Sequence, residues 1–342
     1  MKRNYSILTG ITPSGSGETH IGNYFGMVAP FLDLQKNADK VYLFIADLHA
    51  LTTIQDKIQL QHNVENQVLS YVACGLDPKK VVFYRQSDIG LHPELQSILN
   101  NVTPLGLIKR CHAYKDKLQK GFDEEQVNMG LFSYPILMAA DILMYEPDYV
   151  PVGDDQRQHI EITRDIAGYF NQAFGQTFKL PDIYNVKETA RLVGTDGTRK
   201  MSKSLNNYIS VFEDEAKIKK QIMSCFTDPK RIRPTDPGRV EGNPIFIYHD
   251  LVNQDKDEVI DLKQRYKTGK VGDVEVKEKL FKALLKRFDK ERKNYQELKN
   301  NPEKIKEILQ EGAKKAREQA EKKMMEVREK IGITNKYSFF KY

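Results

Sequence analysis

The sequence contains no tryptophan, only three cysteines and no long apolar run. No stretch approaches the roughly 20 apolar residues of a membrane-spanning helix, so we expect no membrane partner. The first residues, MKRNY, run into a short strand-like segment and lack the apolar core of a signal peptide. The absence of both signals favours a cytoplasmic protein.

The cysteines, Cys74, Cys111 and Cys225, lie far apart in the sequence. None forms a Cys-x-x-Cys pair, and the adjacent Cys111 and His112 have no neighbours with the spacing of zinc ligands. We therefore expect neither structural disulfides nor a protein-bound metal. The net charge of +6 is compatible with a polyanionic partner but does not identify one.

The N-terminal half alternates strand-like and helix-like segments. Residues 6–10 have the pattern of a short buried strand that ends in Gly, and the apolar runs over residues 41–47 and 81–84 are typical of buried parallel strands. Helical spacing of apolar residues begins near His20 and recurs over residues 58–74. This alternating order favours an α/β fold with a doubly wound, Rossmann-type parallel sheet.

A further strand is expected over residues 149–153. Its closing Gly153 leads into Asp154 and Asp155, and a helix over residues 157–170 follows. Ligands of doubly wound sheets bind at the carboxyl ends of the strands. The two acidic residues are therefore expected in a binding site.

After Ser204 strand-like runs stop and helical periods dominate. Apolar residues recur every three or four positions from Ile305 to Ile331, which indicates one long terminal helix with an apolar stripe. A chain of 342 residues is expected to form more than one domain. We expect an α/β domain over residues 1–204, an all-helical domain over 205–302, and a terminal helix in 303–342 that packs back on the first domain.

A Gly/Ser-rich loop, residues 13–17, joins the first strand to a helix that opens with His20-Ile21-Gly22-Asn23. A helix N-terminus presents free N–H groups and partial positive charge to a phosphate. Gly22 has no Cβ and lets a flat ring approach the backbone, while His20 and Asn23 can donate hydrogen bonds to phosphate oxygens. The alternative is an ordinary strand-turn-helix connection with a capping residue.

A second motif, Lys200-Met201-Ser202-Lys203-Ser204, follows Gly194-Thr195-Asp196-Gly197 and is expected on a mobile loop. Such a loop can close over a triphosphate and concentrate positive charge where negative charge develops. A solvated basic loop is the alternative, but this string is rare by chance.

The two motifs in this order resemble the signatures of class I aminoacyl-tRNA synthetases, with His-Ile-Gly-Asn as a variant of "HIGH". Three further stretches, residues 45–52, 133–143 and 150–161, resemble the tryptophanyl-tRNA synthetase family of bacterial type. The resemblance covers most of the chain to about residue 210 and implies a Rossmann-type catalytic domain followed by a helical, anticodon-binding one.

Tyrosyl-tRNA synthetases share the fold and both signatures and are the closest alternative. They commonly carry Gln two residues before an Asp that matches Asp141, where this sequence has Ala139. Indole has one N–H donor and no acceptor, so a single carboxylate acceptor suffices. The resemblance makes Asp141 the indole partner and Met138 a thioether that packs on the ring. Without it, Asp141 would be interpreted as a capping or paired acid and Met138 as core.

The resemblance implies a role for each matching position. The residues expected near ATP are Thr12, Pro13, Ser14, Gly22, Asn23, Gly153, Asp154, Asp155, Leu192, Lys200, Met201, Ser202, Lys203 and Ser204. Those expected near tryptophan are His49, Tyr134, Met138, Asp141 and Gln156. The residues expected to act in catalysis are His20, Asn23, Lys117, Lys200 and Lys203.

The sequence departs from the family pattern at two places in the first loop. Residues 14–19 are about two positions longer than the common bacterial form, and Thr12 stands where Gln is frequent. The segment between Lys117 and Tyr134 is also longer than in the family pattern, which affects the match of Lys117 to the family's active-site lysine.

The reaction implied is activation of tryptophan with ATP to tryptophanyl-adenylate and pyrophosphate, followed by transfer to tRNA-Trp. ATP is a substrate, accompanied by Mg²⁺, and the resemblance implies a homodimer. Lys230, Arg231 and Arg233 are candidates for tRNA phosphate contacts. A nucleotidyltransferase and a non-charging, tryptophan-binding regulatory paralogue are less favoured, because both signature lysines are present with residues 133–143 and the long helical tail.

Overall fold

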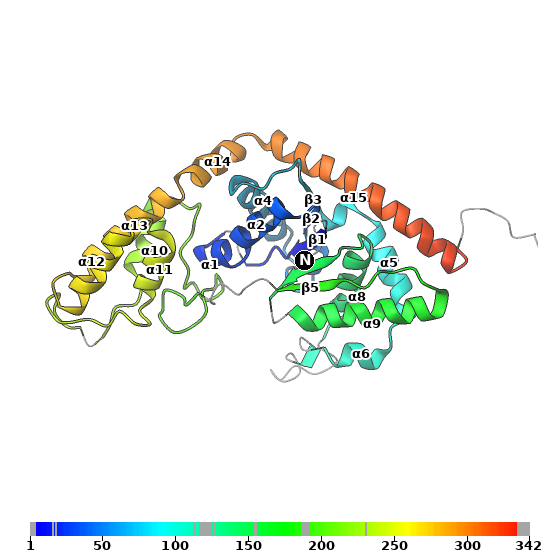
Figure 1. The fold of residues 1–342 in the computed structure, drawn as a ribbon, viewed down its shortest axis with the longest axis horizontal. Coiled ribbons are helices and arrows are strands. Elements are labelled where there is room, and N and C mark those ends of the chain that lie inside the picture. The colour runs from blue at the N-terminus through cyan, green and yellow to red at the C-terminus, as the bar shows by residue number, and fades with distance from the viewer. Residues whose placement is uncertain are drawn as a thin grey trace, which may run out of the picture.

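The computed structural model describes residues 5–15, 17, 19–111, 114–115, 125, 127–153, 156–185, 192–229 and 231–333. Its centre is a parallel sheet of five strands in the order β3-β2-β1-β4-β5 (Figure 1). The strands are β1 (Ser6–Ile11), β2 (Lys40–Ile45), β3 (Val81–Arg85), β4 (Tyr149–Val152) and β5 (Asp182–Asn185). The predicted doubly wound sheet is confirmed, and so are the first four strands. β5 was not predicted.

The chain builds the sheet outward from β1 in two directions. It passes from β1 through β2 to β3, then returns to place β4 on the other side of β1 and β5 beyond it. The crevice between the carboxyl ends of β1 and β4 is therefore the point where the strand order reverses, and such crevices bind ligands in open α/β sheets.

The described helices that precede β5 pack on the sheet or on one another (Figure 1). They are α1 (Ile21–Asn23), the π-helical turn η1 (Tyr24–Val28), α2 (Ala29–Asn37), α3 (Asp47–Ala50), α4 (Lys57–Ala73), the short 3₁₀ turn η2 (Gln86–Asp88), α5 (Leu91–Asn100), α6 (Leu105–Lys109), α8 (Met129–Leu143) and α9 (Arg157–Phe174). The expected helices near His20, over residues 58–74 and over 157–170 are all present.

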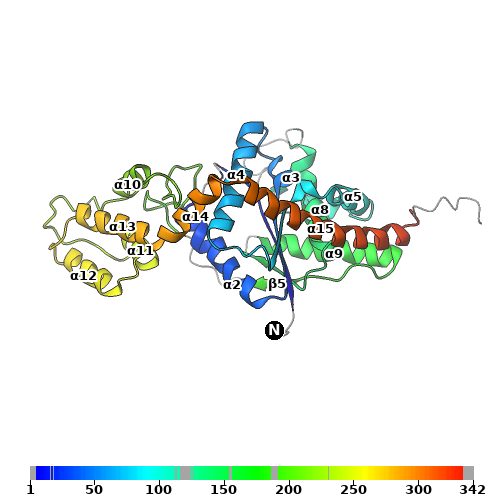
Figure 2. The same ribbon diagram turned by 90° about the horizontal axis from the view of Figure 1, so that it is seen from above.

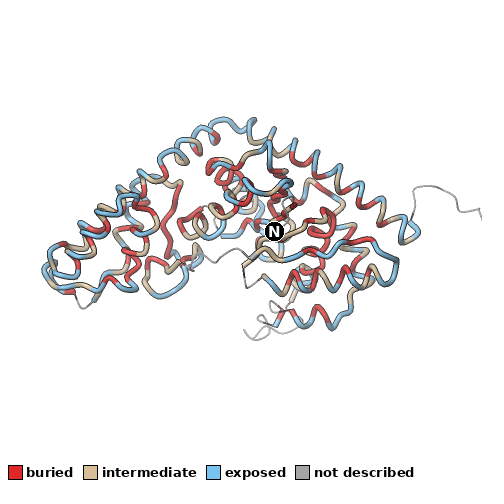
Figure 3. The backbone as a smooth tube through the Cα atoms, viewed as in Figure 1, coloured by how far each residue is buried: buried red, intermediate tan, exposed pale blue. Residues whose placement is uncertain are grey.

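The sheet is buried on both faces, as its continuous apolar strands predict. In β2, Val41, Leu43 and Ile45 contribute to one apolar cluster with α2 and α4, while Tyr42 and Phe44 contribute to a second with α5, α8 and α9. Figure 3 shows this buried centre.

The remaining described helices form an arm and, after it, one long terminal helix. The arm holds α10 (Glu215–Met223), α11 (Pro244–Val252), α12 (Lys256–Lys267) and α13 (Asp273–Arg287), and α14 (Asp289–Lys299) leads back to the sheet. α15 (Pro302–Lys330) crosses the edge strand β3 and reaches α5 (Figure 2). Its apolar stripe, including Ala316, Ala320 and Val327, is buried in the second cluster.

The arm and the sheet share apolar side chains. Tyr248 of α11, Leu284 of α13 and Phe288 belong to the same cluster as β1 and β2. In the described part of the chain, no helix is long and apolar enough to cross a membrane.

Candidate active site

Some of the residues expected near the nucleotide follow β1 and β4, where the strand order reverses. The loop Thr12–Gly15 follows β1, and Gly153 follows β4, where its carbonyl accepts from the Gln156 N–H at 3.0 Å. Asp154, Asp155 and Lys117 lie outside the described residues, as do Ser16 and Glu18 of the lengthened loop. The crevice is therefore bordered by loops from both sides of the switch point.

The first signature forms the start of a helix. The Asn23 N–H donates to His20 Nδ1 at 3.1 Å, and the His20 N–H donates to Asn23 Oδ1 at 3.4 Å. This reciprocal arrangement is a capping box made with His instead of Ser or Thr. Both side chains are thus engaged with the helix itself, so the structure confirms the expected helix start.

Polar side chains of α4 hydrogen-bond to the loop that precedes the first signature. Gln67 donates to the Thr12 carbonyl at 3.2 Å, and Asn63 donates to the Pro13 and Gly15 carbonyls at 3.3 and 2.7 Å. Gln59 adds a bond to the Gly15 carbonyl at 3.3 Å. Residues at i, i+4 and i+8 share one helix face, which is why one helix can support the whole loop. We did not predict these residues, although the polar stripe is visible in the sequence.

The second signature is a hydrogen-bonded loop. The Met201 N–H donates to the Leu192 carbonyl at 2.9 Å, and the Gly194 N–H donates to the Arg199 carbonyl at 2.7 Å. Inside the turn, Asp196 accepts from the N–H groups of Thr198 and Arg199. The described contacts therefore define one conformation for the loop that we expected to be mobile.

Burial opposes ionisation of Asp196. Hydrogen bonds from the Thr198 and Arg199 backbones and from the Asn207 side chain outweigh it, so the pKa of Asp196 lies below its ordinary value. The ionised carboxylate is an acceptor for each of these donors, which stabilises the turn that precedes Lys200.

The two signatures touch each other. A Cβ built on Gly22 would lie 3.3 Å from Met201 Sδ, and one on Gly15 would lie 3.2 Å from Lys203 Cδ. The strand-like residues after the second signature also pair with the first, because the Ile21 N–H donates to the Ile209 carbonyl at 3.0 Å. These contacts support the expectation that both motifs form one site.

Lys200 and Lys203 act electrostatically on the first signature. Burial, with the charges of Lys203 and Lys200 acting in the same direction, lowers the pKa of His20 to about 3. His20 is therefore neutral at physiological pH, and its Nδ1 is free of a proton and accepts the Asn23 N–H. The positive charge at this edge of the crevice comes from the lysines.

One face of α8 carries three residues expected near tryptophan. Tyr134, Met138 and Asp141 stand at i, i+4 and i+7, so they share a side of the helix. The Tyr134 hydroxyl lies 3.0 Å from His159 Nε2, and its ring centroid lies 6.2 Å from that of His49. The structure thus brings His49, Tyr134 and Asp141 together.

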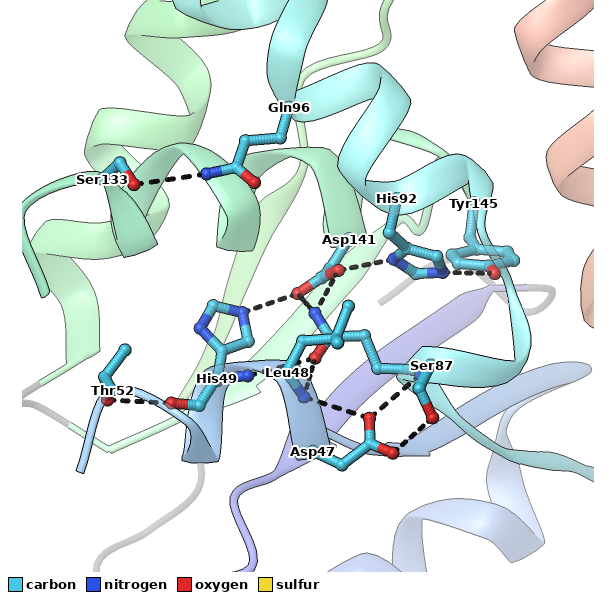
Figure 4. Close-up of polar contacts among 11 residues, drawn as sticks. Asp47, Leu48, His49, Thr52, Ser87, His92, Gln96, Ser133, Asp141 and Tyr145 are labelled. Atoms are coloured by element: carbon cyan, nitrogen blue, oxygen red, sulfur yellow. Dashed lines mark hydrogen bonds and ion pairs between the residues drawn. The ribbon is translucent and has the colours of Figure 1, made fainter. Parts of the chain in front are cut away.

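Asp141 is fully buried at the centre of a polar network (Figure 4). His49 Nε2 lies 2.8 Å from Oδ2, Gln86 Nε2 donates to both oxygens at 2.8 and 2.9 Å, and His92 Nδ1 faces Oδ1. Burial alone would raise the pKa of Asp141, but the bonds from His49 and His92 outweigh it and the pKa lies below its ordinary value. Asp141 is an ionised acceptor.

Gln86 and His92 are functional candidates that sequence reasoning missed. Gln86 Oε1 accepts from the N–H groups of Leu48 and His49 at 3.2 and 3.4 Å, and His92 Nε2 lies 3.0 Å from the Tyr145 hydroxyl. They are 55 and 49 residues from Asp141. No local pattern signals such contacts.

Two of the three basic candidates for tRNA contacts have a described position. The Arg231 guanidinium is buried, donates to the carbonyls of Pro234, Asp236 and Val271, and pairs with Asp273 at 3.1 Å. It therefore supports its own loop, and our expectation of a phosphate contact from this residue was wrong. Arg233 is exposed, and Lys230 lies outside the described residues.

Known proteins resemble this chain over nearly its whole length. The family described as tRNA synthetases class I (W and Y) matches residues 1–289. The tryptophan–tRNA ligase of Fusobacterium nucleatum is 44% identical, with 97% of this chain and 98% of the relative covered. The crystal structure of Campylobacter jejuni tryptophanyl-tRNA synthetase complexed with ADP and tryptophan superposes with a TM-score of 0.88 at 43% identity, covering 96% of this chain and 99% of that one.

A tyrosine enzyme is more distant. The tyrosyl-tRNA synthetase of Archaeoglobus fulgidus has a TM-score of 0.61 at 22% identity, covering 86% of this chain and 91% of the other. That likeness concerns the fold alone.

Proposed function

This chain belongs to the class I tRNA synthetases, among the tryptophan–tRNA ligases, and we propose how the residues around the crevice divide the work of that reaction. The observation that carries the proposal is that the first signature and the loop before it lie against the second signature, Gly22 beside Met201 and Gly15 beside Lys203. This arrangement surrounds the switch point of the sheet with phosphate-binding groups from two distant segments.

In the first step the tryptophan carboxylate attacks the α-phosphorus of ATP. The new bond joins a carboxylate oxygen to phosphorus, and the bond to the β-phosphate oxygen breaks and releases pyrophosphate. A carboxylate is ionised at neutral pH, so no general base is needed. Catalysis then rests on positioning and on charge stabilisation.

Lys200 and Lys203 supply the charge that meets the leaving pyrophosphate. The helix start at His20 and Asn23, whose N–H groups are engaged in the capping box, lies beside this charge, and the loop Thr12–Gly15 borders the nucleotide on the support of α4. His20 is neutral and acts as a hydrogen-bonding group, not as a cation. Lys117, Asp154 and Asp155 remain predictions.

ATP enters this proposal as its magnesium complex. In the described ranges, no group of three or more His, Cys, Asp or Glu side chains could hold a metal ion. The ion would therefore be held by phosphate oxygens and water, as Mg²⁺ commonly is in nucleotide sites.

Tryptophan would lie beside α8. Asp141 is the acceptor for the indole N–H, Met138 packs on the ring, and His49 and Tyr134 border it. Gln156 would meet the ammonium or carboxylate end. The ionised state of Asp141 supports its role, because a carboxylate has only acceptor positions and no O–H donor of its own.

In the second step the acyl group passes to the terminal ribose of tRNA-Trp. We propose that residues 1–204 form the catalytic domain, that the helical domain in 205–302 reads the anticodon, and that the terminal helix in 303–342 packs back toward the catalytic domain. A homodimer in the cytoplasm completes the proposal. Sedimentation of the purified protein tests the dimer.

Pyrophosphate exchange with each of the twenty amino acids tests the assignment. Exchange should depend on tryptophan and Mg²⁺, and exchange driven by tyrosine alone would overturn the specificity. Asp141→Ala should weaken tryptophan binding far more than ATP binding. Because the protein contains no tryptophan, the fluorescence of bound L-tryptophan measures the affinity directly. Unchanged affinity would reject Asp141 as the indole partner.

A further inference from the structure

The hydrogen-bonding capacity of Asp141 is already filled by the protein. Each carboxylate oxygen has about two acceptor positions. Oδ1 is contacted by Gln86 and His92, and Oδ2 by Gln86 and His49 (Figure 4). The side chain has no exposed surface. An indole N–H can therefore bond to Asp141 only if one of these donors leaves.

Gln86 and His92 are poorly suited to leave. Both are completely buried. Gln86 also accepts two backbone N–H groups of α3, and His92 also bonds to the Tyr145 hydroxyl. Moving either side chain would leave a second buried polar group without its hydrogen-bond partner. The free-energy cost would therefore exceed that of losing the bond to Asp141 alone.

His49 differs from these two donors. Its side chain retains 12% of its exposed area, and its ring lies beside Tyr134, on the side of the network that faces the proposed amino-acid site. In the described part of the chain, the ring has no hydrogen bond other than the one to Asp141. Its departure would therefore break a single bond and bring the ring toward solvent.

We propose that His49 is a positioning residue that bonds to the indole acceptor, Asp141, when tryptophan is not bound and yields it to tryptophan. This inference rests on the proposed role of Asp141 as indole partner. Binding exchanges one N–H donor, the imidazole, for another, the indole. The carboxylate keeps its bonds with and without substrate, so it never becomes a buried unpaired charge.

The exchange has a consequence for ligands that lack the N–H. The benzothiophene analogue of tryptophan carries sulfur in place of the indole nitrogen and cannot donate. In the wild-type protein His49 stays on Asp141 when the analogue binds, so the carboxylate remains satisfied. Without His49, the same analogue would bury an unpaired acceptor position, which is costly.

The experiment compares the affinity ratio of the analogue and tryptophan in three proteins. His49→Leu removes the donor at similar volume, and His49→Gln places an amide donor near the position of Nε2. The ratio Kd(analogue)/Kd(tryptophan) should be small in the wild type, rise roughly tenfold in His49→Leu and return toward the wild-type value in His49→Gln. Tryptophan is followed by its own fluorescence and the analogue by competition.

Nitrogen NMR of histidine-labelled protein provides the direct observation. The protected Nε2–H signal of His49, assigned by its absence in His49→Leu, should disappear when tryptophan is added and persist when the analogue is added. A signal that survives tryptophan, or a ratio equal in wild type and His49→Leu, would overturn the exchange.

Asp141→Ala, which removes the acceptor, separates this inference from the proposed function. If that variant binds tryptophan as well as the wild type, Asp141 is not the indole partner and both fail. If it loses affinity while the ratio is insensitive to His49, only the exchange fails.

Discussion

The Ser202 backbone N–H donates to Asn207 Oδ1 at 2.7 Å, within the second signature loop. The Asn207 amide also donates to the Lys200 carbonyl at 3.1 Å and to Asp196 Oδ2 at 2.8 Å. One buried side chain thus holds both sides of the loop that carries Lys200 and Lys203.

Asn207→Ala should release this loop. We expect the rate of tryptophan-dependent pyrophosphate exchange to fall about tenfold to a hundredfold, because lysine positioning is lost. Tryptophan affinity, measured by ligand fluorescence, should stay unchanged. Asn206→Gly is the matched control, since Asn206 is exposed and has a positive φ of 51° that glycine accepts. A normal rate in Asn207→Ala would show that the loop does not depend on this residue.

Gly15 is expected to be needed for the placement of Lys203. Its φ is +66°, and an added Cβ would press on the Lys203 stem at 3.2 Å. Gly15→Ala should therefore weaken ATP binding and slow exchange while leaving tryptophan binding intact. Gly75→Ala supplies the control, because Gly75 has a φ of +108° but open space around it. Backbone strain of about 1–2 kcal/mol should appear in both variants, and equal exchange rates would contradict the role of the contact.

Arg292 links α14 to the segment that pairs with the first signature. Its Nη1 donates to the carbonyls of Val211 and Glu213 at 2.7 and 2.9 Å, and the Val211 N–H donates to the Thr19 carbonyl. Arg292→Ala should lower the free energy of unfolding by roughly 1–3 kcal/mol, because two charge-assisted bonds are lost. Urea unfolding measures this. Lys293→Ala, which removes only an exposed pair with Asp289, should change stability by less than about 0.5 kcal/mol. Similar losses of unfolding free energy in Arg292→Ala and Lys293→Ala would refute the link between α14 and this segment.

His20 should make the protein sensitive to mild acid. Its pKa is about 3 in the folded protein and 6.5 ordinarily, so between these values the unfolded chain binds more protons. Its contribution is complete above pH 6.5 and falls by about 1.4 kcal/mol per pH unit below it. Between pH 6.5 and 5 the wild type should lose about 2 kcal/mol more than His20→Asn, which keeps a capping side chain without a titrating ring. Parallel urea curves at the two pH values measure the difference, and equal losses would contradict the buried neutral histidine.

Much of the fold could be predicted because its signals are local. The strands β1 to β4 are short segments centred on apolar residues, and α15 carries its stripe at helical spacing. β5 was missed because it has only four residues and no apolar run, and it exists by pairing with β4. A strand of that kind is defined by its neighbour more than by its own residues.

The candidate site divides in the same way. The signature motifs and the α8 residues were predicted from contiguous strings. Asn207, Gln86 and His92 were not, since each acts through a hydrogen bond to a partner that only folding brings near. The occupied state of Asp141 was equally invisible, because a sequence shows which acceptor is present but not which donors already use it.

The sequence by itself determined the class of reaction, the identity of the two signatures and the alternation of strands and helices. These follow from residue types at short spacing, which restrict local conformation and local chemistry. The tertiary structure alone decided that the signatures touch, that His20 is neutral, and that His49 stands on the acceptor proposed for indole. Burial, charge proximity and hydrogen-bond saturation depend on three-dimensional neighbours, and the chain order does not specify them.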